Sequence, residues 1–505
     1  MINKILIANR GEIAVRIISS AKEMGIKTVA VYSDFDKYSL YTRLADEAYH
    51  IGPPPAKESY LLADKIIEIA KMSGADAIHP GYGFLSERSY FAKMCADNGI
   101  KFIGPPAEAI EMLGDKTKAK ILAVKNDVPT VPGTEEPIKD LEEGKKIADS
   151  IGYPLLIKAS AGGGGKGMRI VRSPEEFESG LRMSQNEARS SFGDESVFIE
   201  KYVVGGRHIE FQILADEHGN AVHLGERECS MQRRHQKIIE ETPSVVMDDS
   251  LRKEMGECAK RLAKAAGYTN AGTMEFLVDK DNNYYFLEMN TRLQVEHPIT
   301  EMRTDTDLVR EQILIASGEK LSFTQEDVTF TGHTIECRIC AEDPDNNFLP
   351  SIGKMDYIKN ILGNGMREDT GIEEGNEISI YYDSMISKLI AHGETREIAI
   401  SKMGEALENY IISGLKTNIE FLYSLLNSGG FKTGKYDTQY VEKTFIPEIY
   451  EKGNELSDEE TERAIALGAC LFKAREENTS RGRNRIQNNG VSKWSKMKFE
   501  TYRTK

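Results

Sequence analysis

The sequence predicts a multidomain chain that joins an α/β region to a mixed α+β region. Its 505 residues correspond to about three domains. In the first hundred residues, short apolar runs alternate with helical patterns, which is typical of a parallel sheet. Farther along the chain, strand patterns separated by short polar inserts indicate antiparallel hairpins.

Composition excludes several classes of protein. The chain has 65 Lys and Arg against 80 Asp and Glu, a formal net charge of −15, so its overall field does not favour nucleic acid. It has no apolar run of the roughly 18 residues that a membrane span requires. Six cysteines in so long a chain do not form a disulfide framework. We therefore expect a cytoplasmic protein with no nucleic-acid and no membrane partner.

The first 115 residues are predicted to form a parallel βαβ domain. Strands are expected at residues 5–8, 27–32, 75–79 and 100–104. A helix is expected at residues 12–24, ended by Gly25. The first turn contains a single glycine, Gly11, and lacks the G-x-G-x-x-G fingerprint, so dinucleotide binding is not expected.

Three further segments are expected. Pro129 and Pro132 interrupt the helical periodicity and mark a boundary. The segments beyond it are a small α/β unit at 131–203, a larger mixed domain at 204–446 and a tail at 447–505. In the tail, Leu467, Leu471 and Ala474 fall at helical spacing, and the segment 478–505 is basic and contains the only tryptophan, Trp494.

A glycine-rich loop follows a strand in the small unit. Residues 155–158 form a strand pattern that ends in Lys158, and residues 161–168 contain four consecutive glycines followed by Lys166. Such a backbone can approach a ligand closely and turn its N–H groups toward an anion. No Ser or Thr follows the Gly-Lys pair, so this is not a Walker A loop. A surface hairpin is the alternative interpretation of this pattern.

Two carboxylates are predicted to face each other across a hairpin. Its strands are expected at residues 272–278 and 284–290. A register that pairs Asp279 with Tyr284 also pairs position 277 with 286, and Glu275 with Glu288. Like charges repel at such positions unless a cation lies between them. With Asn290 on the same face, these oxygen donors suit Mg²⁺ or Mn²⁺, whereas a solvated sheet face is the alternative.

The polar pattern continues beyond this hairpin. Every even position carries a polar residue: Glu288, Asn290, Arg292, Gln294 and Glu296. An extended chain would present them as one continuous row. Arg292 can grip a small planar oxyanion with two hydrogen bonds, and Glu296 can act as a base on that anion. We favour this interpretation over a solvated strand face, which usually carries Lys, Ser and Thr.

A basic run occupies residues 231–237. Its Gln232, His235 and Lys237 can line a phosphate site, but exposed basic runs and nuclear targeting signals have the same composition. The local sequence leaves these alternatives open.

In chain order, these motifs resemble those of biotin carboxylases, the ATP-grasp component of biotin-dependent carboxylases. The similarity covers residues 1–446 and includes KILIANRGEIAVRI at 4–17, HPGYGFLSE at 79–87, IKASAGGGGKGM at 157–168, ECSMQRRHQKIIEE at 228–241, EMNTRLQVEHPITE at 288–301, ECRICAEDP at 336–344 and YYDSMISKLI at 381–390. The resemblance implies an ATP-grasp fold with an N-terminal parallel βαβ domain, a mobile lid that carries the glycine loop, and a large mixed C-terminal domain.

The resemblance also implies roles for individual residues. ATP would be bound by Lys116, Lys158, Gly162, Gly163, Gly164, Gly165, Lys166, Gly167, Glu200, Lys201, Val203, His208, Gln232, His235 and Leu277. Two Mg²⁺ or Mn²⁺ ions would be held by Glu275, Glu288 and Asn290, and bicarbonate by Lys237, Arg292, Gln294 and Val295. The catalytic residues would be Glu296 as base and Arg338 at the biotin enolate, with Lys237 and Arg292. Biotin would contact Tyr82, Gly83 and Arg338.

The implied activity is the ATP- and bicarbonate-dependent carboxylation of biotin through carboxyphosphate. Only seven residues follow Lys498, too few to close a biotinyl domain, so we expect biotin on a separate biotin carboxyl carrier protein. A carboxyltransferase subunit and a second copy of the chain are the other expected partners. The acceptor, whether acetyl-CoA, propionyl-CoA or pyruvate, stays open, and the tail is expected to help hold a partner.

Two other functions compete with this interpretation. One is another ATP-grasp carboxylate-amine ligase that uses an acyl phosphate, and the other is a nucleotide-sensing subunit without turnover. Neither requires the complete polar row from Arg292 to Glu296, so we favour biotin carboxylation.

Overall fold

The computed structural model describes residues 1–453 except 135, 139, 160–167, 193–194 and 362. The predictions for Gly162 to Gly167, and for a helix around residues 467–474, lie outside the described residues. The chain forms two compact units, Met1–Glu442 and Lys443–Lys505. The described part of the second unit includes helix α15 (Ile446–Gly453). The finer domain limits predicted at 115, 131 and 203 stay predictions.

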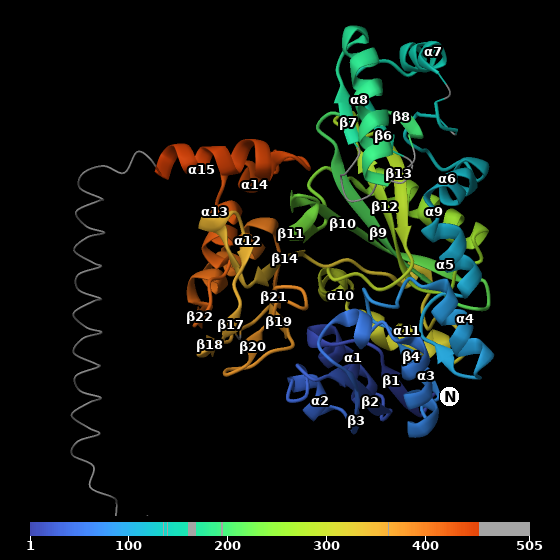
Figure 1. The fold of residues 1–505 in the computed structure, drawn as a ribbon. Coiled ribbons are helices and arrows are strands. Elements are labelled where there is room, and N and C mark those ends of the chain that lie inside the picture. The colour runs from blue at the N-terminus through green and yellow to red at the C-terminus, as the bar shows by residue number, and fades with distance from the viewer. Residues whose placement is uncertain (135, 139, 160–167, 193–194, 362, 454–505) are drawn as a thin grey trace, which may run out of the picture. The chain divides into compact units, whose positions relative to one another are not determined.

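Five parallel strands form the N-terminal sheet, in the order β3-β2-β1-β4-β5 (Figure 1). They are β1 (Lys4–Ile7), β2 (Lys27–Ser33), β3 (Glu47–Gly52), β4 (Ala77–His79) and β5 (Lys101–Phe102). The parallel sheet and four of its strands agree with the prediction. Strand β3 was not predicted, because the first four residues of this edge strand alternate between half-buried and exposed and it contains no apolar run.

Helix α1 (Gly11–Glu23) joins this sheet to the larger domain. Its Ile13 and Ile17 pack in one core with Ile5 of β1 and with Leu308 and Ile313 of helix α11 (Leu308–Ala316). The other helices of the N-terminal region are α2 (Leu40–Leu44), α3 (Ala63–Ser73), α4 (Ser89–Asp97), α5 (Ala107–Gly114) and α6 (Lys116–Lys125). The shared core fixes the start of α1 against the larger domain.

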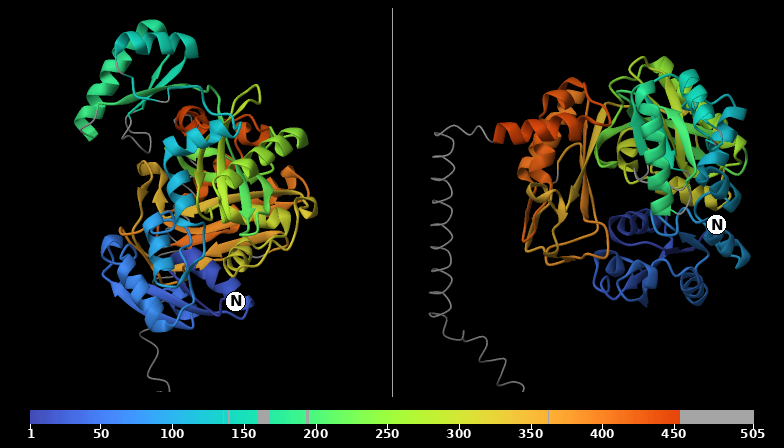
Figure 2. Two further views of the ribbon diagram at one scale, coloured as in Figure 1. Left: turned by 90° about the vertical axis from the view of Figure 1, so that its right-hand side faces the viewer. Right: turned by 45° about the horizontal axis from the view of Figure 1, so that its top comes forward.

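A three-stranded sheet, in the order β7-β6-β8, has its own core. Its elements are α7 (Leu141–Ile151), β6 (Leu155–Ala159), β7 (Met168–Val171), α8 (Pro174–Phe192) and β8 (Val197–Lys201). The strands are antiparallel, and α8 packs against β6 and β7 (Figure 2). The glycine-rich segment connects β6 to β7.

The largest sheet has eight antiparallel strands in the order β13-β12-β9-β10-β11-β14-β21-β19. They are β9 (Arg207–Ala215), β10 (Ala221–Arg233), β11 (Gln236–Thr242), β12 (Asn270–Val278), β13 (Tyr284–Asn290), β14 (His333–Cys340), β19 (Met366–Thr370) and β21 (Met385–Gly393). The accompanying helices are α9 (Asp249–Ala265), α10 (His297–Thr304), α12 (Arg396–Asn409), α13 (Ile419–Leu426) and α14 (Gly429–Thr433).

Short strands complete the described fold. Three two-stranded sheets are formed by β15 (Glu342–Asp343) with β16 (Leu349–Pro350), β17 (Gly353–Lys354) with β20 (Glu377–Ile378), and β18 (Tyr357–Lys359) with β22 (Ile411–Ser413). Among the described residues, no helix is long and apolar enough to cross a membrane.

Candidate active site

The predicted carboxylate pair lies on the β12–β13 hairpin. Glu275 pairs directly with Glu288, which confirms that part of the register. The predicted pairing of 277 with 286 is wrong, because Phe276 pairs with Phe286 instead. The ladder shifts between Glu275 and Phe276, so Leu287 is the extra residue of a β-bulge. The bulge compensates for a turn that begins one residue earlier than predicted.

Strand β9 explains how charged side chains reach the same site. Its Ile209 and Phe211 pack into an apolar core with residues of α9. Because alternate residues of a strand point to opposite faces, His208 and Glu210 point to the other side of the sheet. Glu210 is fully buried, and His208 lies 3.1 Å from Glu275. Burial lowers the pKa of His208, but Glu275 outweighs it and the pKa is raised.

Lys237 on β11 connects three carboxylates. Its Nζ donates to Glu210 Oε2 at 2.6 Å, to Glu296 Oε1 at 2.6 Å and to Glu275 Oε1 at 3.2 Å. Burial alone would lower the pKa of this ammonium, but Cys229 and the three carboxylates raise it well above its usual value. Lys237 is therefore a fixed cation at the centre of the cluster.

Arg338 on β14 binds Glu296, the predicted base, through its other carboxylate oxygen. It donates from Nε to Glu240 Oε1 at 2.7 Å and from a terminal nitrogen to Glu296 Oε2 at 2.9 Å. Burial would raise the pKa of Glu296, but Lys237 and Arg338 hold it well below its usual value. Burial raises the pKa of Glu240 to about 7, although Arg338 opposes this shift. Glu296 is thus ionised at neutral pH and held by two cations.

Arg227, which was not predicted from the sequence, belongs to the same cluster because it binds Glu210. It is fully buried and donates to Glu210 Oε1 at 2.5 Å, to the Gln212 side chain at 2.8 Å and to Thr273 and Thr300 at 3.0 Å. Glu210 and Glu240 were missed as well. The available signal was the period-2 alternation of charged and apolar residues in strands that are otherwise buried.

The sequence predicted that the polar row from Glu288 to Glu296 is one extended strand, and this prediction is wrong. Strand β13 ends at Asn290, and Glu296 lies directly before α10 as its N-cap residue. The side chains are nevertheless connected, because Arg292 donates to Asn290 Oδ1 at 3.1 Å and to Gln294 Oε1 at 2.7 Å. Asn290 and Gln294 in turn donate to Glu275 Oε1, at 2.7 and 3.2 Å. Hydrogen bonds through an irregular loop therefore replace the expected sheet face.

The two predicted metal carboxylates have different surroundings. The Glu288 side chain is 38% exposed and forms an ion pair of 2.9 Å with Lys116, which is 80% exposed. Glu275 is buried and accepts hydrogen bonds from Lys237, Asn290 and Gln294. The oxygen atoms of Glu275 and Glu288, with the Asn290 amide oxygen, are donors that a hard cation such as Mg²⁺ prefers. Within the described residues, two groups bring three candidate ligand atoms within 4.8 Å of one another, His208–Glu210–Glu275 and Glu210–Cys229–Glu296, and Glu288 belongs to neither.

Several predicted nucleotide residues lie on the three-stranded sheet. Lys158 on β6 forms an ion pair with Glu200 on β8, and Lys120 of α6, which the sequence analysis missed, lies 3.5 Å from the same carboxylate. Burial would raise the pKa of Glu200, but these lysines lower it. Lys201 donates to two backbone carbonyls of the loop before β6, those of Gly152 and Tyr153, at 2.8 and 3.0 Å.

The basic run forms the β10–β11 hairpin. Arg234 and His235 form its exposed turn with positive φ angles of 48° and 65°, and Gln232 pairs directly with Lys237. The pairing with Gln232 therefore positions Lys237, whose side chain reaches the buried carboxylates. Of the remaining predicted nucleotide residues, Leu277 pairs with His208, and Val203 is partly buried.

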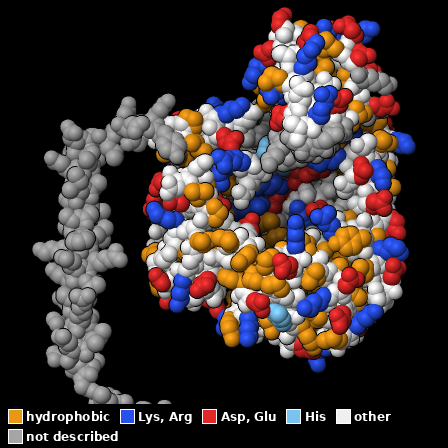
Figure 3. Space-filling view, viewed as in Figure 1, with side chains coloured by type: hydrophobic (Ala, Val, Ile, Leu, Met, Phe, Trp, Pro, Cys, Tyr) orange, Lys and Arg blue, Asp and Glu red, His pale blue; other side chains and the backbone are white. Residues whose placement is uncertain are grey.

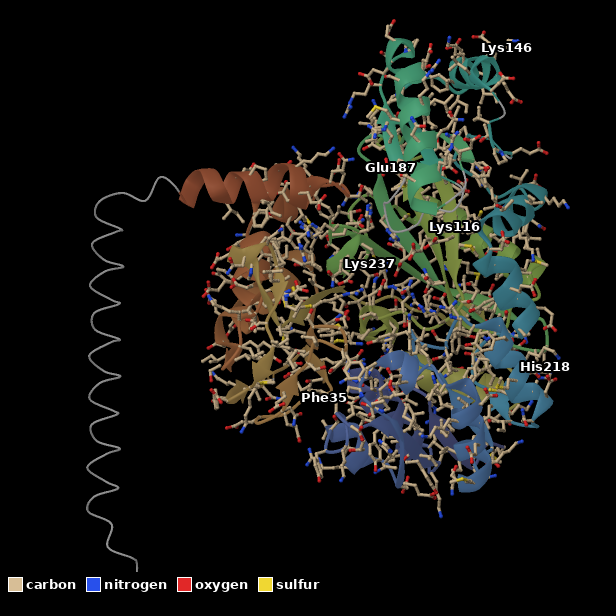
Figure 4. All side chains as sticks on the ribbon, in the orientation of Figure 1. Phe35, Lys116, Lys146, Glu187, His218 and Lys237 are labelled. Atoms are coloured by element: carbon tan, nitrogen blue, oxygen red, sulfur yellow. The ribbon has the colours of Figure 1, made fainter. Side chains whose placement is uncertain are left out.

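A cavity of ≈ 470 Å³ is lined by the predicted biotin residues and by Val295 and Arg338, the chain neighbour and a hydrogen-bond partner of Glu296. Its lining includes Tyr82, Gly83, Arg292, Val295 and Arg338. Figure 3 shows a hollow on this side of the molecule in which Lys and Arg side chains gather beside Asp and Glu. In Figure 4, Lys237 and Lys116 lie beside the large sheet, whereas Lys146 and His218 lie at the periphery.

The antiparallel sheet, the smaller sheet that carries lysines, and the carboxylate hairpin together define an ATP-grasp ligase. Three family models match consecutive segments: "Biotin carboxylase, N-terminal domain" at 1–110, "Carbamoyl-phosphate synthase L chain, ATP binding domain" at 115–324 and "Biotin carboxylase C-terminal domain" at 336–443. These matches and the relatives below confirm the predicted fold class and enzyme class.

Curated relatives specify the family. Biotin carboxylase 1 of Bacillus subtilis is 51% identical over 88% of this chain and 98% of its own length. The propionyl-CoA carboxylase alpha chain of Ruegeria pomeroyi is 49% identical over 97% of this chain and 74% of its own length. The chain therefore belongs to the biotin carboxylase family, whose activity is the ATP-dependent carboxylation of biotin.

A solved structure shares the fold. It is the biotin carboxylase domain dimer of the Hydrogenobacter thermophilus 2-oxoglutarate carboxylase, in complex with MgADP, ADP and bicarbonate. It is 48% identical, with a TM-score of 0.81 over 88% of this chain and 98% of that chain. The ligands named for that domain support ATP, Mg²⁺ and bicarbonate as the ligands of this family.

Proposed function

We propose that this chain carboxylates biotin on a separate biotin carboxyl carrier protein, with bicarbonate as the carbon source. The observation that carries the proposal is the position of Glu296. This carboxylate is held between Lys237 and Arg338, next to a cavity lined by Arg338, Tyr82 and Gly83. A base for bicarbonate and a cation for biotin therefore lie side by side.

Bicarbonate would bind between Lys237, Arg292, Gln294 and the Val295 N–H. In the structure, Lys237 donates to Glu296. When bicarbonate draws the Lys237 ammonium toward itself, the proton affinity of Glu296 rises, because one of its two cations is shared. Glu296 then removes the bicarbonate proton, and the resulting oxyanion attacks the γ-phosphate of ATP to form carboxyphosphate and ADP.

The nucleotide would lie between Lys116 at the start of helix α6 and Lys158 on strand β6. Glu275 and Glu288, with Asn290, would hold Mg²⁺ or Mn²⁺, which neutralises phosphate charge when bound. Lys116 and Lys158 now pair with Glu288 and Glu200, and we infer that they turn to the phosphates. The other nucleotide contacts are assigned to Gly162–Gly167, Glu200, Lys201, Val203, His208, Gln232, His235 and Leu277.

Biotin would enter the cavity beside Tyr82 and Gly83. Carboxyphosphate breaks down to CO₂ and phosphate, and this phosphate takes the ureido N–H proton of biotin. The Arg338 guanidinium stabilises the negative oxygen that develops on the ureido group, and the nitrogen then attacks CO₂. Arg338 would have to release part of its contact with Glu296 or Glu240 for this step, and both partners lie within 2.9 Å of it.

The partners belong to the same proposal. A second copy of the chain is supported by the dimer described for the Hydrogenobacter thermophilus domain. The acceptor stays open among acetyl-CoA, propionyl-CoA and pyruvate. Two proteins of nearly equal similarity, at 49% and 48% identity, are named for propionyl-CoA and for 2-oxoglutarate. Acceptor choice is therefore assigned to a carboxyltransferase subunit.

The test is ATP hydrolysis by the purified chain with bicarbonate and free biotin varied separately. We expect bicarbonate to be required, biotin to accelerate ADP release, and labelled bicarbonate to yield carboxybiotin. The Glu296→Gln variant is the negative control. A different ATP-grasp ligase would be supported if ATP turnover did not depend on bicarbonate and required another carboxylate and an amine instead.

The tail has its own test. Removing residues 455–505 should leave carboxylation of free biotin unchanged and weaken co-purification of a carrier or carboxyltransferase subunit. Equal recovery of partners with both chains would contradict a role for the tail in assembly.

A further inference from the structure

A buried lysine that the proposed mechanism does not use lies directly behind the base. Lys388 of β21 is fully buried, and its Nζ donates to the carbonyl oxygen of Val295 at 3.0 Å. The same ammonium lies 3.2 Å from Glu12 Oε2 and 3.6 Å from Asp369 Oδ2. Lys388 therefore connects the first turn of α1 and strand β19 to the loop that carries Val295 and Glu296.

The loop is held at two successive carbonyls. His297 Nδ1 lies 2.9 Å from the Gln294 carbonyl oxygen, and Lys388 donates to the next carbonyl, that of Val295. A carbonyl oxygen can only accept, so Nδ1 of His297 carries the proton. Because each peptide unit is planar, the first bond orients the Val295 N–H and the second orients the Glu296 N–H. These are the amide proposed for bicarbonate and the backbone of the proposed base.

The same contacts extend to the predicted biotin turn and to helix α10. The Tyr82 hydroxyl donates to Glu12, which is the ion-pair partner of Lys388. Asp369, its other partner, accepts two hydrogen bonds from Arg367 at 2.7 and 2.8 Å. Arg367 also donates to Glu301 of α10 at 2.7 Å. Lys388 thus lies between the residues proposed to contact biotin and the loop proposed to bind bicarbonate.

Stability alone is a weak reason for this arrangement. Replacing a buried ion pair by well-packed apolar residues is often neutral or stabilising, because desolvation offsets the Coulomb attraction. A donor aimed at a backbone carbonyl of the active-site loop has a specific geometric effect that apolar packing cannot supply. The hydrogen bond to Val295 is therefore the informative contact of Lys388.

We propose that Lys388 is a positioning residue for the carboxylation reaction. It fixes the Val295 carbonyl, and thereby the peptide unit that leads into the proposed base, directly after the bicarbonate amide, while Glu12 connects this loop to Tyr82. The inference rests on the proposed roles of Val295, Glu296 and Tyr82. It adds that correct placement of these groups depends on a residue that contacts neither bicarbonate nor biotin.

The main test is the double variant Lys388→Met with Glu12→Gln. Lys388→Met alone leaves Glu12 buried without its cation, whereas the double variant removes one charge of each sign. The amide oxygen introduced by Glu12→Gln can still accept a hydrogen bond from Tyr82. We expect a melting temperature near that of the unchanged chain. Bicarbonate-dependent ATP turnover should fall about 10- to 100-fold, the range for a slightly misplaced catalytic group. The KM for bicarbonate should rise, and the KM for ATP should stay the same.

A matched control is Lys402→Met. Lys402 donates to the carbonyl of His392 at 2.8 Å, so it makes the same kind of bond to the far end of β21, away from the active-site loop. This variant should leave both KM values unchanged. Glu12→Gln alone keeps the Lys388 bond to Val295, so it should raise the KM for bicarbonate less than the double variant does.

The proposal is overturned if the double variant folds with unchanged turnover and unchanged bicarbonate KM, because Lys388 is then only a structural cation. Lys388→Arg is measured in parallel, since it keeps the charge but moves the donor atoms. It should raise the bicarbonate KM. If neither variant folds, the role of Lys388 is structural and the proposal fails as well. Absence of bicarbonate-dependent hydrolysis in the unchanged chain would instead overturn the proposed function itself.

Discussion

The two ends of the polar segment from Glu288 to Glu296 differ in how completely the protein surrounds them. The Glu288 side chain is 38% exposed, and among the residues that the structure describes its ion-pair partner is the largely exposed Lys116. The Glu296 side chain is 1% exposed and is held by both Lys237 and Arg338. Charges interact more strongly where water is excluded, so the Glu296 end, the proposed base end, is organised in advance. The Glu288 end, the proposed metal end, would be completed by the ligands it binds.

This difference in exposure indicates that the two ends have different roles in the proposed site. The exposed Glu288 carboxylate can exchange its ion pair with Lys116 for a bound metal ion at little cost in free energy, because an exposed ion pair is weak. A buried carboxylate between two cations cannot lose a partner as cheaply. We therefore expect substitutions at the metal end to act through metal and nucleotide, and substitutions at the base end to act on the chemical step.

The largest effect is expected for Glu288→Gln. This variant removes one charge of the carboxylate pair, and ATP turnover should be abolished while the fold stays intact. Turnover at increasing Mg²⁺ concentration and the melting temperature are the measurements. Glu111→Gln is the matched control, because Glu111 forms a similarly exposed ion pair with Lys118 at 2.9 Å in the same region. Normal turnover of the Glu288 variant at ordinary Mg²⁺ would show that the pair does not hold the metal.

Glu296→Gln tests the base end. Turnover should fall about 10²- to 10⁴-fold, the usual range for a lost general base. Nucleotide affinity should change little, because Glu296 is assigned to bicarbonate. Steady-state kinetics and direct ADP binding measure the two quantities. A variant that keeps its full bicarbonate-dependent activity would remove Glu296 from the mechanism.

Arg338→Gln separates the two chemical steps. The variant should impair carboxybiotin formation more than bicarbonate-dependent ATP hydrolysis without biotin, because the Arg338 charge is needed when the biotin enolate develops. The comparison uses the ratio of the two rates in the variant and in the unchanged chain. An equal loss in both assays would indicate that Arg338 acts mainly by holding Glu296 or by supporting the fold.

The smallest effect on activity is expected for Glu241→Gln, next to Glu240 on β11. Burial would raise the pKa of Glu241, but His333 and Arg396 lower it to about 2. A lowered folded-state pKa stabilises the fold above the unfolded value, near 4.5, and this contribution is lost as pH falls toward 2. The lost contribution is about 3 kcal/mol. Unfolding measured from pH 6 to pH 2 should show this loss in the unchanged chain and a flatter profile in the variant. Identical unfolding profiles for the variant and the unchanged chain would show that Glu241 does not cause the loss of stability at low pH.

Local patterns in the sequence predicted the parts of the site that lie close together in the chain. The Glu275–Glu288 pair follows from two strand patterns and a short polar insert, because a hairpin brings near neighbours into register. The bulge at Leu287 was not predictable, because it depends on where the turn closes. The polar alternation to Glu296 predicted a connected set of side chains, but α10 begins where an extended strand was expected.

By itself the sequence determined the alternating α/β start, the carboxylate hairpin, the polar segment and, through its motifs, the family. Only the tertiary structure decided which charges surround Glu296, the proposed base. Glu210, Lys237 and Arg338 come from strands β9, β11 and β14, which are brought together by a sheet order that differs from the chain order. Lys388 is likewise indistinguishable in the sequence from a solvated lysine. Its proposed role depends on burial beside Glu12, 376 residues away in the chain, because contacts between distant segments are set by packing rather than by local periodicity.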